Sequence, residues 1–182
     1  MKHGALLGIV GRSGAGKTTL IERLLPVLDG SGLRVSTVKH AHCGLELDRP
    51  GKDSHRHQAA GAYETLLVGE HGTAVFKHHD PHHDALETLL QRLQGVDLVL
   101  IEGYKNYAMP KIEVWDPSVG EPPLACEGLV VSAVIADETV PQITVPTFVR
   151  DDVGMIASFI QQMFAAGGPR RSEGFQFIKP LN

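Results

Sequence analysis

The sequence has few cysteines and no long apolar run. Its 182 residues contain two cysteines, Cys43 and Cys126, which lie far apart and form no C-x-x-C pair. Such cysteine usage is typical of a reducing compartment, so we expect a cytoplasmic protein. No apolar stretch approaches the roughly 20 residues that a membrane-spanning helix needs, and we expect no membrane partner. The apolar stretch after Lys2 ends at Gly11 without a cleavage pattern, which favours a first strand over a signal peptide.

The chain also lacks an excess of positive charge and any internal repeat. Its net charge of −4 at pH 7 gives no basic footprint, and we expect no nucleic-acid partner. Hydrophobic residues at 42% and charged residues at 21% are ordinary for a globular protein. The length suits one domain with a buried core. We expect that domain to cover residues 1–166, followed by a C-terminal tail over residues 167–182, where periodicity is lost.

Residues 11–18 carry the clearest motif in the chain, the Walker A or P-loop pattern G-x-x-x-x-G-K-T. An apolar run over residues 5–10 precedes it and a helical pattern over residues 18–28 follows, which is the context that a P-loop requires. Glycine lets backbone N–H groups approach phosphate oxygens, and the N-terminus of the following helix favours the same negative charge. We therefore expect a nucleotide-binding loop. Its binding residues are expected to be Gly11, Arg12, Ser13, Gly14, Ala15, Gly16, Lys17, Thr18 and Thr19.

Two residues of this loop have chemical roles beyond backbone contact. Lys17 is expected to reach the β and γ phosphates as a catalytic residue, and the Thr18 hydroxyl is placed to bind Mg²⁺. A P-loop also needs an acidic partner at the end of a neighbouring strand. The apolar run over residues 96–101 ends at Glu102 and Gly103. We expect Glu102 to be catalytic and to bind Mg²⁺, and Gly103 to let the backbone approach a γ-phosphate; a solvated strand-end glutamate is the alternative.

The residue that reads the base is harder to identify. Guanine-specific P-loop proteins usually carry the tetrapeptide N/T-K-x-D after a late strand, and no such tetrapeptide occurs here. Asp137 follows a strand pattern over residues 129–136 and stands where the base-reading carboxylate is expected. A simple turn-forming aspartate is the alternative interpretation, and the sequence leaves both open.

A polar, turn-rich segment over residues 39–56 follows the strand expected at residues 33–39. In open α/β sheets ligands bind at this edge, so the segment either faces an anion or substrate or is plain surface. Asp53 or Ser54 is expected to cap a short helix that runs to about residue 60.

Histidines in two segments raise the question of a metal site, since imidazole suits Zn²⁺ or Ni²⁺. The first segment offers His40, His42 and Cys43, and the second holds four histidines within residues 77–84. Neither has the spacing of a structural zinc site with a second half-site. An exposed polar loop is the simpler interpretation of the second cluster.

The alternation of strands and helices behind a P-loop predicts an α/β fold. We expect three layers, with a mainly parallel sheet of the P-loop NTPase type and helices on both faces. An antiparallel hairpin at one side is predicted from residues 64–68 and 73–76. The other expected elements are helices at residues 84–94 and 152–164, strands at residues 111–115 and 129–136, and a short segment at residues 143–145.

With these segments in order, the chain resembles the MobB family of molybdopterin-guanine dinucleotide biosynthesis adaptor proteins. The resemblance covers the chain from its start to about residue 138. Besides the P-loop, it rests on the V-K-H block at residues 38–40, D-R-P-G-K-D-S at residues 48–54, L-I-E-G-Y-K at residues 100–105 and P-K-I-E at residues 110–113. The K-H and P-G-K-D-S blocks are far more specific than the P-loop.

This resemblance implies a GTP-binding protein with weak hydrolysis. It also implies a homodimer that works beside the molybdopterin guanylyltransferase and other molybdenum cofactor enzymes. Glu102 would belong to the Mg²⁺ shell, and Lys39, His40 and Asp53 would surround the nucleotide cleft. Family members often have a second histidine and an aspartate where this chain has a cysteine and a glycine at residues 43–44, which argues against a metal role.

Two other function classes share the motif. A small-molecule kinase needs arginine or lysine clamps and usually a closing lid, and the scattered arginines of this chain form no arginine-rich lid. A nucleotide-driven metallochaperone is favoured only if the histidines bind metal. We therefore expect a GTP-binding adaptor with weak GTPase activity at most.

Overall fold

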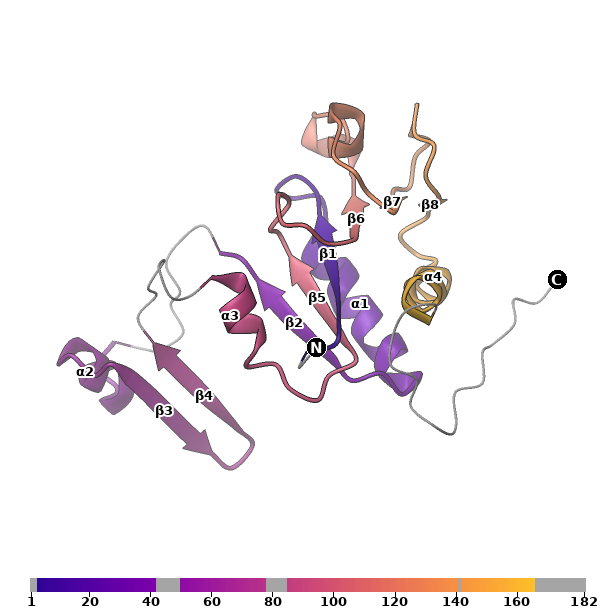
Figure 1. Ribbon diagram of the computed structural model, residues 1–182. Coiled ribbons are helices and arrows are strands. Elements are labelled where there is room, and N and C mark those ends of the chain that lie inside the picture. The colour runs from indigo at the N-terminus through magenta and orange to yellow at the C-terminus, as the bar shows by residue number, and fades with distance from the viewer. Residues whose placement is uncertain (1–2, 42–49, 78–84, 141, 166–182) are drawn as a thin grey trace. The chain divides into compact units, whose positions relative to one another are not determined.

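The computed structural model describes residues 3–41, 50–77, 85–140 and 142–165. The chain divides into two compact units (Figure 1). The first unit comprises Met1–His40 and Leu93–Asn182, and the second comprises Ala41–Arg92. In the described part of the chain, no helix is long and apolar enough to span a bilayer.

A six-stranded sheet forms the centre of the first unit, in the order β2-β5-β1-β6-β7-β8. All neighbouring strands in it are parallel. The strands are β1 (Ala5–Val10), β2 (Val35–Lys39), β5 (Leu98–Glu102), β6 (Lys111–Val114), β7 (Ala133–Ile135) and β8 (Thr147–Phe148). Because parallel strands end at the same edge, the residues after each strand gather at one side of the sheet. The mainly parallel sheet predicted from the sequence is confirmed.

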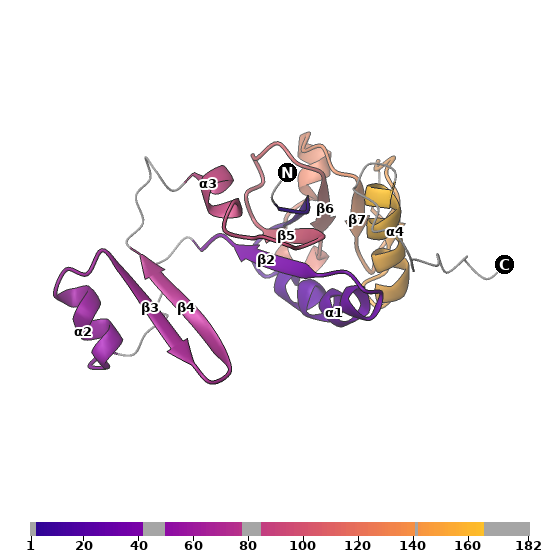
Figure 2. The same cartoon turned by 60° about the horizontal axis from the view of Figure 1, so that its bottom comes forward.

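Two helices pack together over one face of this sheet (Figure 2). Helix α1 (Lys17–Gly30) buries an apolar stripe that includes Leu20, Leu24 and Leu28, as its spacing predicts. Helix α4 (Val153–Ala165) adds Ile156 and Ile160 to the same core cluster. Full burial of each such side chain stabilises the fold by about 1.5–3 kcal/mol, so this face anchors the loop that precedes α1.

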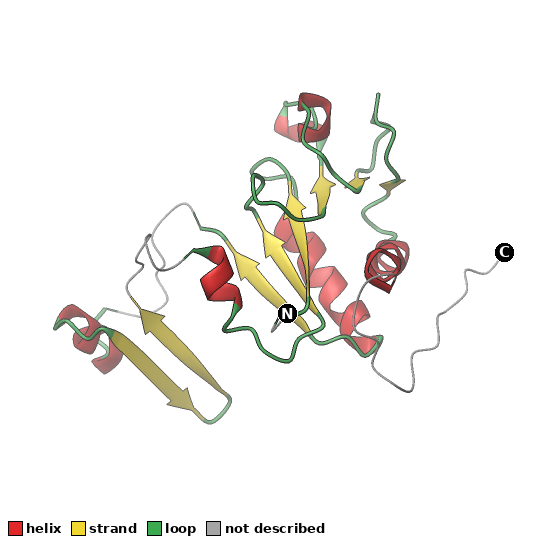
Figure 3. Cartoon of the chain, viewed as in Figure 1, coloured by secondary structure: helices red, strands yellow, loops and turns green. Residues whose placement is uncertain are grey.

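Strand β7 shows why the middle of the sheet is apolar on both faces. Its side chains alternate: Ala133 and Ile135 join the cluster under α1 and α4, whereas Val134 joins a second cluster with Val10 and Val131. The second cluster lies beneath the connection from β6 to β7. That connection contains the 3-10 turns η1 (Pro117–Val119) and η2 (Leu124–Glu127), and loops form much of the chain between β6 and β8 (Figure 3).

Several expected elements are shorter than, or displaced from, their sequence patterns. The strand predicted at residues 129–136 is limited to β7, and the short segment expected at residues 143–145 lies just before β8. The helix predicted at residues 84–94 is the five-residue α3 (Leu86–Leu90). Apolar runs beside turns satisfy burial without forming a ladder, so the pattern overestimates their regular length.

The second unit contains the predicted antiparallel hairpin. Strand β3 (Glu64–Gly69) pairs with β4 (Gly72–Lys77), and the two glycines face each other across the turn. Helix α2 (Asp53–Ala59) lies where a short helix was expected. The predicted side-chain cap is wrong: Lys52 occupies the N-cap position without a side-chain hydrogen bond, and Asp53 lies in the first turn. An acidic first-turn residue still complements the helix dipole.

Gly11 is held against β6 in a way that no other residue tolerates. Its φ is +142°, and a Cβ there would lie 2.2 Å from the carbonyl oxygen of Val114. We expect Gly11→Ala to lower the free energy of unfolding by roughly 2–4 kcal/mol, since the clash is with backbone. Gly30→Ala is the matched control, because a Cβ at Gly30 meets nothing within 4 Å. Urea unfolding of both variants checks the difference, and equal stabilities would contradict this account.

Candidate functional site

The P-loop joins β1 to α1 in the backbone conformation that its glycines predict. Gly11, Gly14 and Gly16 have φ angles of +142°, +81° and +91°, all in the region that disfavours side chains. Ala15 is fully buried and anchors the loop, whereas Ser13 and Gly14 are exposed. Helix α1 begins directly after Gly16, so its free backbone N–H groups lie at the end of the loop.

Lys17 folds back over the loop that precedes it. Its Nζ donates to the carbonyl oxygens of Gly11 at 3.1 Å and Arg12 at 2.7 Å. Burial lowers the pKa of the Lys17 ammonium, Glu102 opposes that shift, and Lys39 adds to it. Neutral carbonyls compensate a positive charge only in part, so phosphate oxygens would be stronger partners for this ammonium.

Thr18, Glu102 and Lys39 form a cluster from three different elements. The Thr18 hydroxyl lies 3.1 and 3.0 Å from the two carboxylate oxygens of Glu102. The Lys39 Nζ lies 3.5 Å from the Glu102 carboxylate and 3.4 Å from the Thr18 oxygen. Lys39 and Glu102 are register partners in the β2–β5 pair, which places both beside the start of α1. The hydroxyl and carboxylate oxygens are ligands that Mg²⁺ prefers, so the donor set fits that ion.

Arg12 reaches from the P-loop to the connection between β6 and β7. Its guanidinium pairs with Glu121 at 2.9 Å through Nη1 and with Glu127 through Nη2. Val119 of the same connection would lie 3.8 Å from a Cβ placed on Gly14. The connection therefore lies against the P-loop and neutralises its arginine.

The buried carboxylate of Glu113 holds this connection in place through hydrogen bonds. Glu113 of β6 is fully buried, and its two oxygens accept from the backbone N–H groups of Leu124 at 2.6 Å and Ala125 at 2.9 Å. These donors lie at the start of η2, which ends with Glu127. Burial raises the pKa of Glu113, and the two backbone donors and Arg12 oppose that shift.

Arg150 ties together the ends of three strands on the other side of β1. Its backbone N–H donates to Asp137 Oδ1 at 3.0 Å, and its Nε lies 3.1 Å from Asp137 Oδ2. Its Nη2 donates to the Trp115 carbonyl at 2.8 Å and pairs with Asp116 at 3.0 Å. Hydrogen bonds from Ser118 lower the pKa of Asp116 most, and Arg150 lowers it further. Asp137 thus lies in a charged cluster, with its side chain 55% exposed.

Two of the remaining predicted residues of the first unit, His40 and Gly103, border the Glu102 cluster. The backbone N–H of His40 donates to the Glu102 carbonyl at 3.1 Å, and the His40 ring packs against that of Tyr104 with a centroid distance of 4.6 Å and a tilt of 38°. Gly103 has a φ of +96°, and a Cβ there would lie 3.3 Å from the Cβ of His40. Thr19 is exposed in the first turn of α1. The structure therefore places Lys39, His40 and Gly103 beside Glu102, as a shared strand edge predicts.

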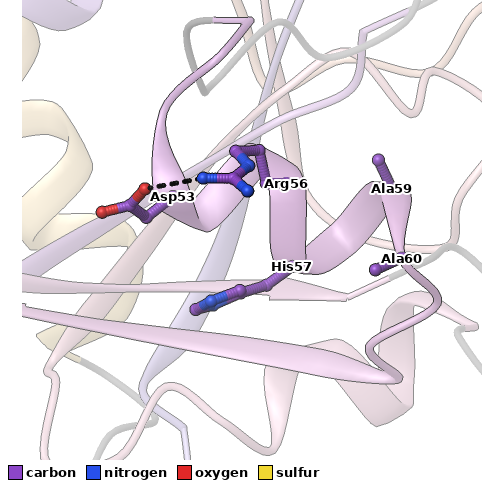
Figure 4. A pocket seen from close by; sticks show the side chains of 5 residues that line it. All are labelled: Asp53, Arg56, His57, Ala59 and Ala60. Atoms are coloured by element: carbon purple, nitrogen blue, oxygen red, sulfur yellow. Dashed lines mark ion pairs between the residues drawn. The ribbon is translucent and has the colours of Figure 1, made fainter.

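Asp53 belongs to the second unit. It is exposed at the start of α2 and pairs with Arg56 at 3.6 Å. These two residues line a shallow hollow together with His57, Ala59 and Ala60 (Figure 4). The position expected for Asp53 beside the nucleotide cleft stays a prediction.

The metal hypothesis falls mostly outside the part of the chain that the structure describes. His42, Cys43 and the histidines within residues 78–83 all lie there. Among the described residues, no group of three or more histidine, cysteine, aspartate or glutamate side chains is arranged to hold a metal ion.

Sequence reasoning missed Arg150, Glu113 and the two carboxylates that hold Arg12. Glu113 did carry a signal, because a charged residue inside an apolar strand pattern must find partners when it is buried. Arg150 carried none, since it follows a two-residue strand and contacts residues more than ten positions away.

Comparisons with known proteins identify the proteins to which this chain is similar. The family model described as Molybdopterin guanine dinucleotide synthesis protein B matches residues 6–137. The molybdopterin-guanine dinucleotide biosynthesis adapter protein of Haemophilus influenzae is 42% identical over 109 residues, which span 59% of this chain and 61% of that protein. The Escherichia coli protein of the same name is 31% identical over 161 residues, spanning 85% of this chain and 90% of that protein.

Solved structures lead to the same group of proteins. A crystal structure of molybdopterin-guanine biosynthesis protein B aligns with a TM-score of 0.70 and 30% identity. The alignment covers 87% of this chain and 99% of that one, so the similarity extends well beyond the P-loop.

The raised pKa of Glu113 predicts a specific pH dependence of stability. The folded state holds the Glu113 proton more tightly than the unfolded state, so this contribution is present at low pH and is lost as pH rises through the raised pKa. A tenfold difference in proton affinity between the two states corresponds to about 1.4 kcal/mol. We expect the wild type to lose stability relative to Glu113→Gln as pH rises from about 4 to about 7.

Urea unfolding across that pH range measures the difference. Glu121→Gln, which changes an exposed carboxylate of the same connection, is the control and should track the wild type. A gap between the wild type and Glu113→Gln that stays constant with pH would refute this role of Glu113.

Proposed function

The chain belongs to the MobB family, and from this membership and the site we propose that it is a GTP-binding adaptor protein of molybdenum cofactor biosynthesis. The contact between the Thr18 hydroxyl and the Glu102 carboxylate, at the start of the helix behind an intact P-loop, carries the proposal. It joins the two side chains that a Mg²⁺-nucleotide needs. The relatives are named for the synthesis of molybdopterin guanine dinucleotide, which supports GTP as the nucleotide.

In this proposal, different residues of the chain bind different parts of the nucleotide. The P-loop backbone contacts the phosphates, and Lys17 exchanges its two carbonyl partners for β and γ oxygens. Thr18 and Glu102 would hold Mg²⁺. When bound, the ion neutralises charge on the phosphate oxygens. Lys39 is a second cation beside Glu102, close to where a γ-phosphate would lie.

Arg12 supports weak rather than efficient hydrolysis. Fast phosphoryl transfer in P-loop proteins depends on an arginine that stabilises charge in the transition state. Here the P-loop arginine is paired with Glu121 and Glu127, and its charge is already compensated. We therefore propose GTPase activity that is weak at most.

The order of the strands supports one orientation of the nucleotide along the edge of the sheet. Glu102 ends β5 on one side of β1, whereas Asp137 follows β7 on the other side. A triphosphate on the P-loop, with its γ end toward Glu102, extends its base toward the ends of β6 and β7. Asp137 is the proposed reader of guanine, since a carboxylate accepts from the ring N–H and the amino group.

The hairpin of the second unit offers a surface for the proposed homodimer. Leu66 and Val68 project from the same face of β3, and Leu66 is the register partner of Val75. All three are exposed. Exposed apolar side chains gathered on one face are typical of an interaction surface, so a second copy of the chain or a molybdenum cofactor enzyme would bury apolar surface by covering this face.

Glu102→Gln tests the Mg²⁺ site and with it the nucleotide proposal. The amide keeps the shape but removes the negative charge, so GTP binding should depend less on Mg²⁺ and hydrolysis should fall about tenfold or more. Nucleotide titrations with and without Mg²⁺, together with phosphate release, measure both effects. Glu22→Gln on the exposed face of α1 is the control. A wild type that binds no GTP would end the proposal, and a variant that matches the wild type would remove Glu102 from the site.

Asp137→Asn tests the reading of the base. Asparagine cannot accept from both guanine groups, so the affinity for GTP should fall toward that for ATP by about a hundredfold. The new amide can donate to xanthine, which carries a carbonyl where guanine has an amino group, and xanthosine triphosphate should bind better than GTP. Competition titrations with the three nucleotides measure the order, with Glu138→Gln as the neighbouring control. A preserved preference for GTP would move base reading to another residue.

A further inference from the structure

Arg150 leaves Asp137 able to bind a ligand while fixing its orientation. The backbone N–H of Arg150 contacts one carboxylate oxygen and its Nε lies beside the other, so the carboxylate cannot rotate freely. A carboxylate offers about four lone-pair sites, and the backbone N–H of Arg150 takes up one of them. The sites that remain are enough for the two N–H groups at the guanine edge. At the corresponding edge adenine has a ring nitrogen that carries no proton. Adenine would therefore place an acceptor opposite the carboxylate, which is also an acceptor.

The same side chain also connects Asp137 to the phosphate loop. A Cβ placed on Gly16 would lie 2.8 Å from the Arg150 Nη1, so the guanidinium fills the space beside the last glycine of the loop. Gly16, Arg150 and Thr19 line one small cavity. One arginine therefore lies against both the last glycine of the P-loop and the Asp137 carboxylate.

The charges of the cluster suit a donor-rich ligand edge. Arg150 contributes one positive charge, and Asp116 and Asp137 contribute two negative charges. The net charge of this cluster is therefore negative. The cluster lies at the end of the site proposed to face the base, where the ligand carries no phosphate. The Asp137 side chain is 55% exposed, and an ion pair with so exposed a partner adds little to stability, so stability alone does not account for the pairing of Arg150 with Asp137.

We propose that Arg150 is the positioning residue for nucleotide selection: it holds Asp137 in the plane and at the distance from the P-loop that match a guanine nucleotide. This inference rests on the proposed GTP binding and adds the residue that confers the preference. Arg150 itself makes no contact with the base. Its removal should change which nucleotide binds while leaving the phosphate site intact.

The test compares Arg150→Met and Arg150→Lys with the wild type in the full-length chain. Affinities are measured in Mg²⁺ for GTP, ATP and inorganic tripolyphosphate, which has phosphates but no base. Arg150→Met should lower the ratio of GTP to ATP affinity about tenfold or more, with tripolyphosphate affinity within about threefold of the wild type. Arg150→Lys keeps the charge but lacks the planar guanidinium. Its ratio of GTP to ATP affinity should lie between those of the wild type and Arg150→Met.

Arg34→Met is the matched control. Arg34 also pairs with an aspartate, Asp97, through its backbone N–H and its guanidinium. It lies at the opposite edge of the sheet, just before β2, and its loss should leave the ratio unchanged. Thermal unfolding shows whether each variant folds. If Arg150→Met does not fold, the inference still requires that the ratio of GTP to ATP affinity falls in Arg150→Lys.

The outcomes separate this inference from the function on which it rests. If the wild type prefers GTP and both Arg150 variants keep that preference, Arg150 has no positioning role and GTP binding stands. If tripolyphosphate affinity falls as much as GTP affinity, Arg150 acts on the phosphate loop and the inference is wrong. A wild type with no preference for GTP would overturn both this inference and the guanine reading at Asp137.

Discussion

Parallel pairing of β1 with β5 on one side and β6 on the other is the constraint on which the site depends. Because all six strands end at one edge, groups from distant parts of the sequence lie around the loop that follows β1. Glu102 arrives from β5 and Lys39 from β2, while Arg150 arrives from beyond β8. The backbone of Gly11, close against Val114, keeps the loop at this edge.

Electrostatic pairing is the common property of the cations around the P-loop. Lys39 lies beside Glu102, Arg12 contacts two glutamates, and Arg150 contacts two aspartates. Of these four residues, Lys17 is the one whose hydrogen bonds go to carbonyl oxygens and to no carboxylate. An incoming triphosphate therefore meets one cation with open capacity and several that are already neutralised. Beside these cations, Thr18 and Glu102 supply oxygen atoms of the kind that Mg²⁺ prefers.

The sequence predicted the parts of the fold that depend on neighbours along the chain. The P-loop, its flanking strand and helix, the hairpin and the position of Glu102 at a strand end all follow from local patterns. The partners of Arg12 and Arg150 could not be predicted, because they depend on strand order and on loops more than ten residues away. The prediction that Asp53 or Ser54 caps α2 was wrong, because Lys52, one residue before Asp53, occupies the N-cap position.

The second unit is an insertion between β2 and β5 of the first. The chain leaves the sheet directly after Lys39 and His40, and the backbone of His40 is hydrogen-bonded to the Glu102 carbonyl. The insertion therefore begins at the end of β2, where Lys39 lies 3.5 Å from the Glu102 carboxylate. The charged cluster at this strand end is thus also the point at which the chain enters the second unit.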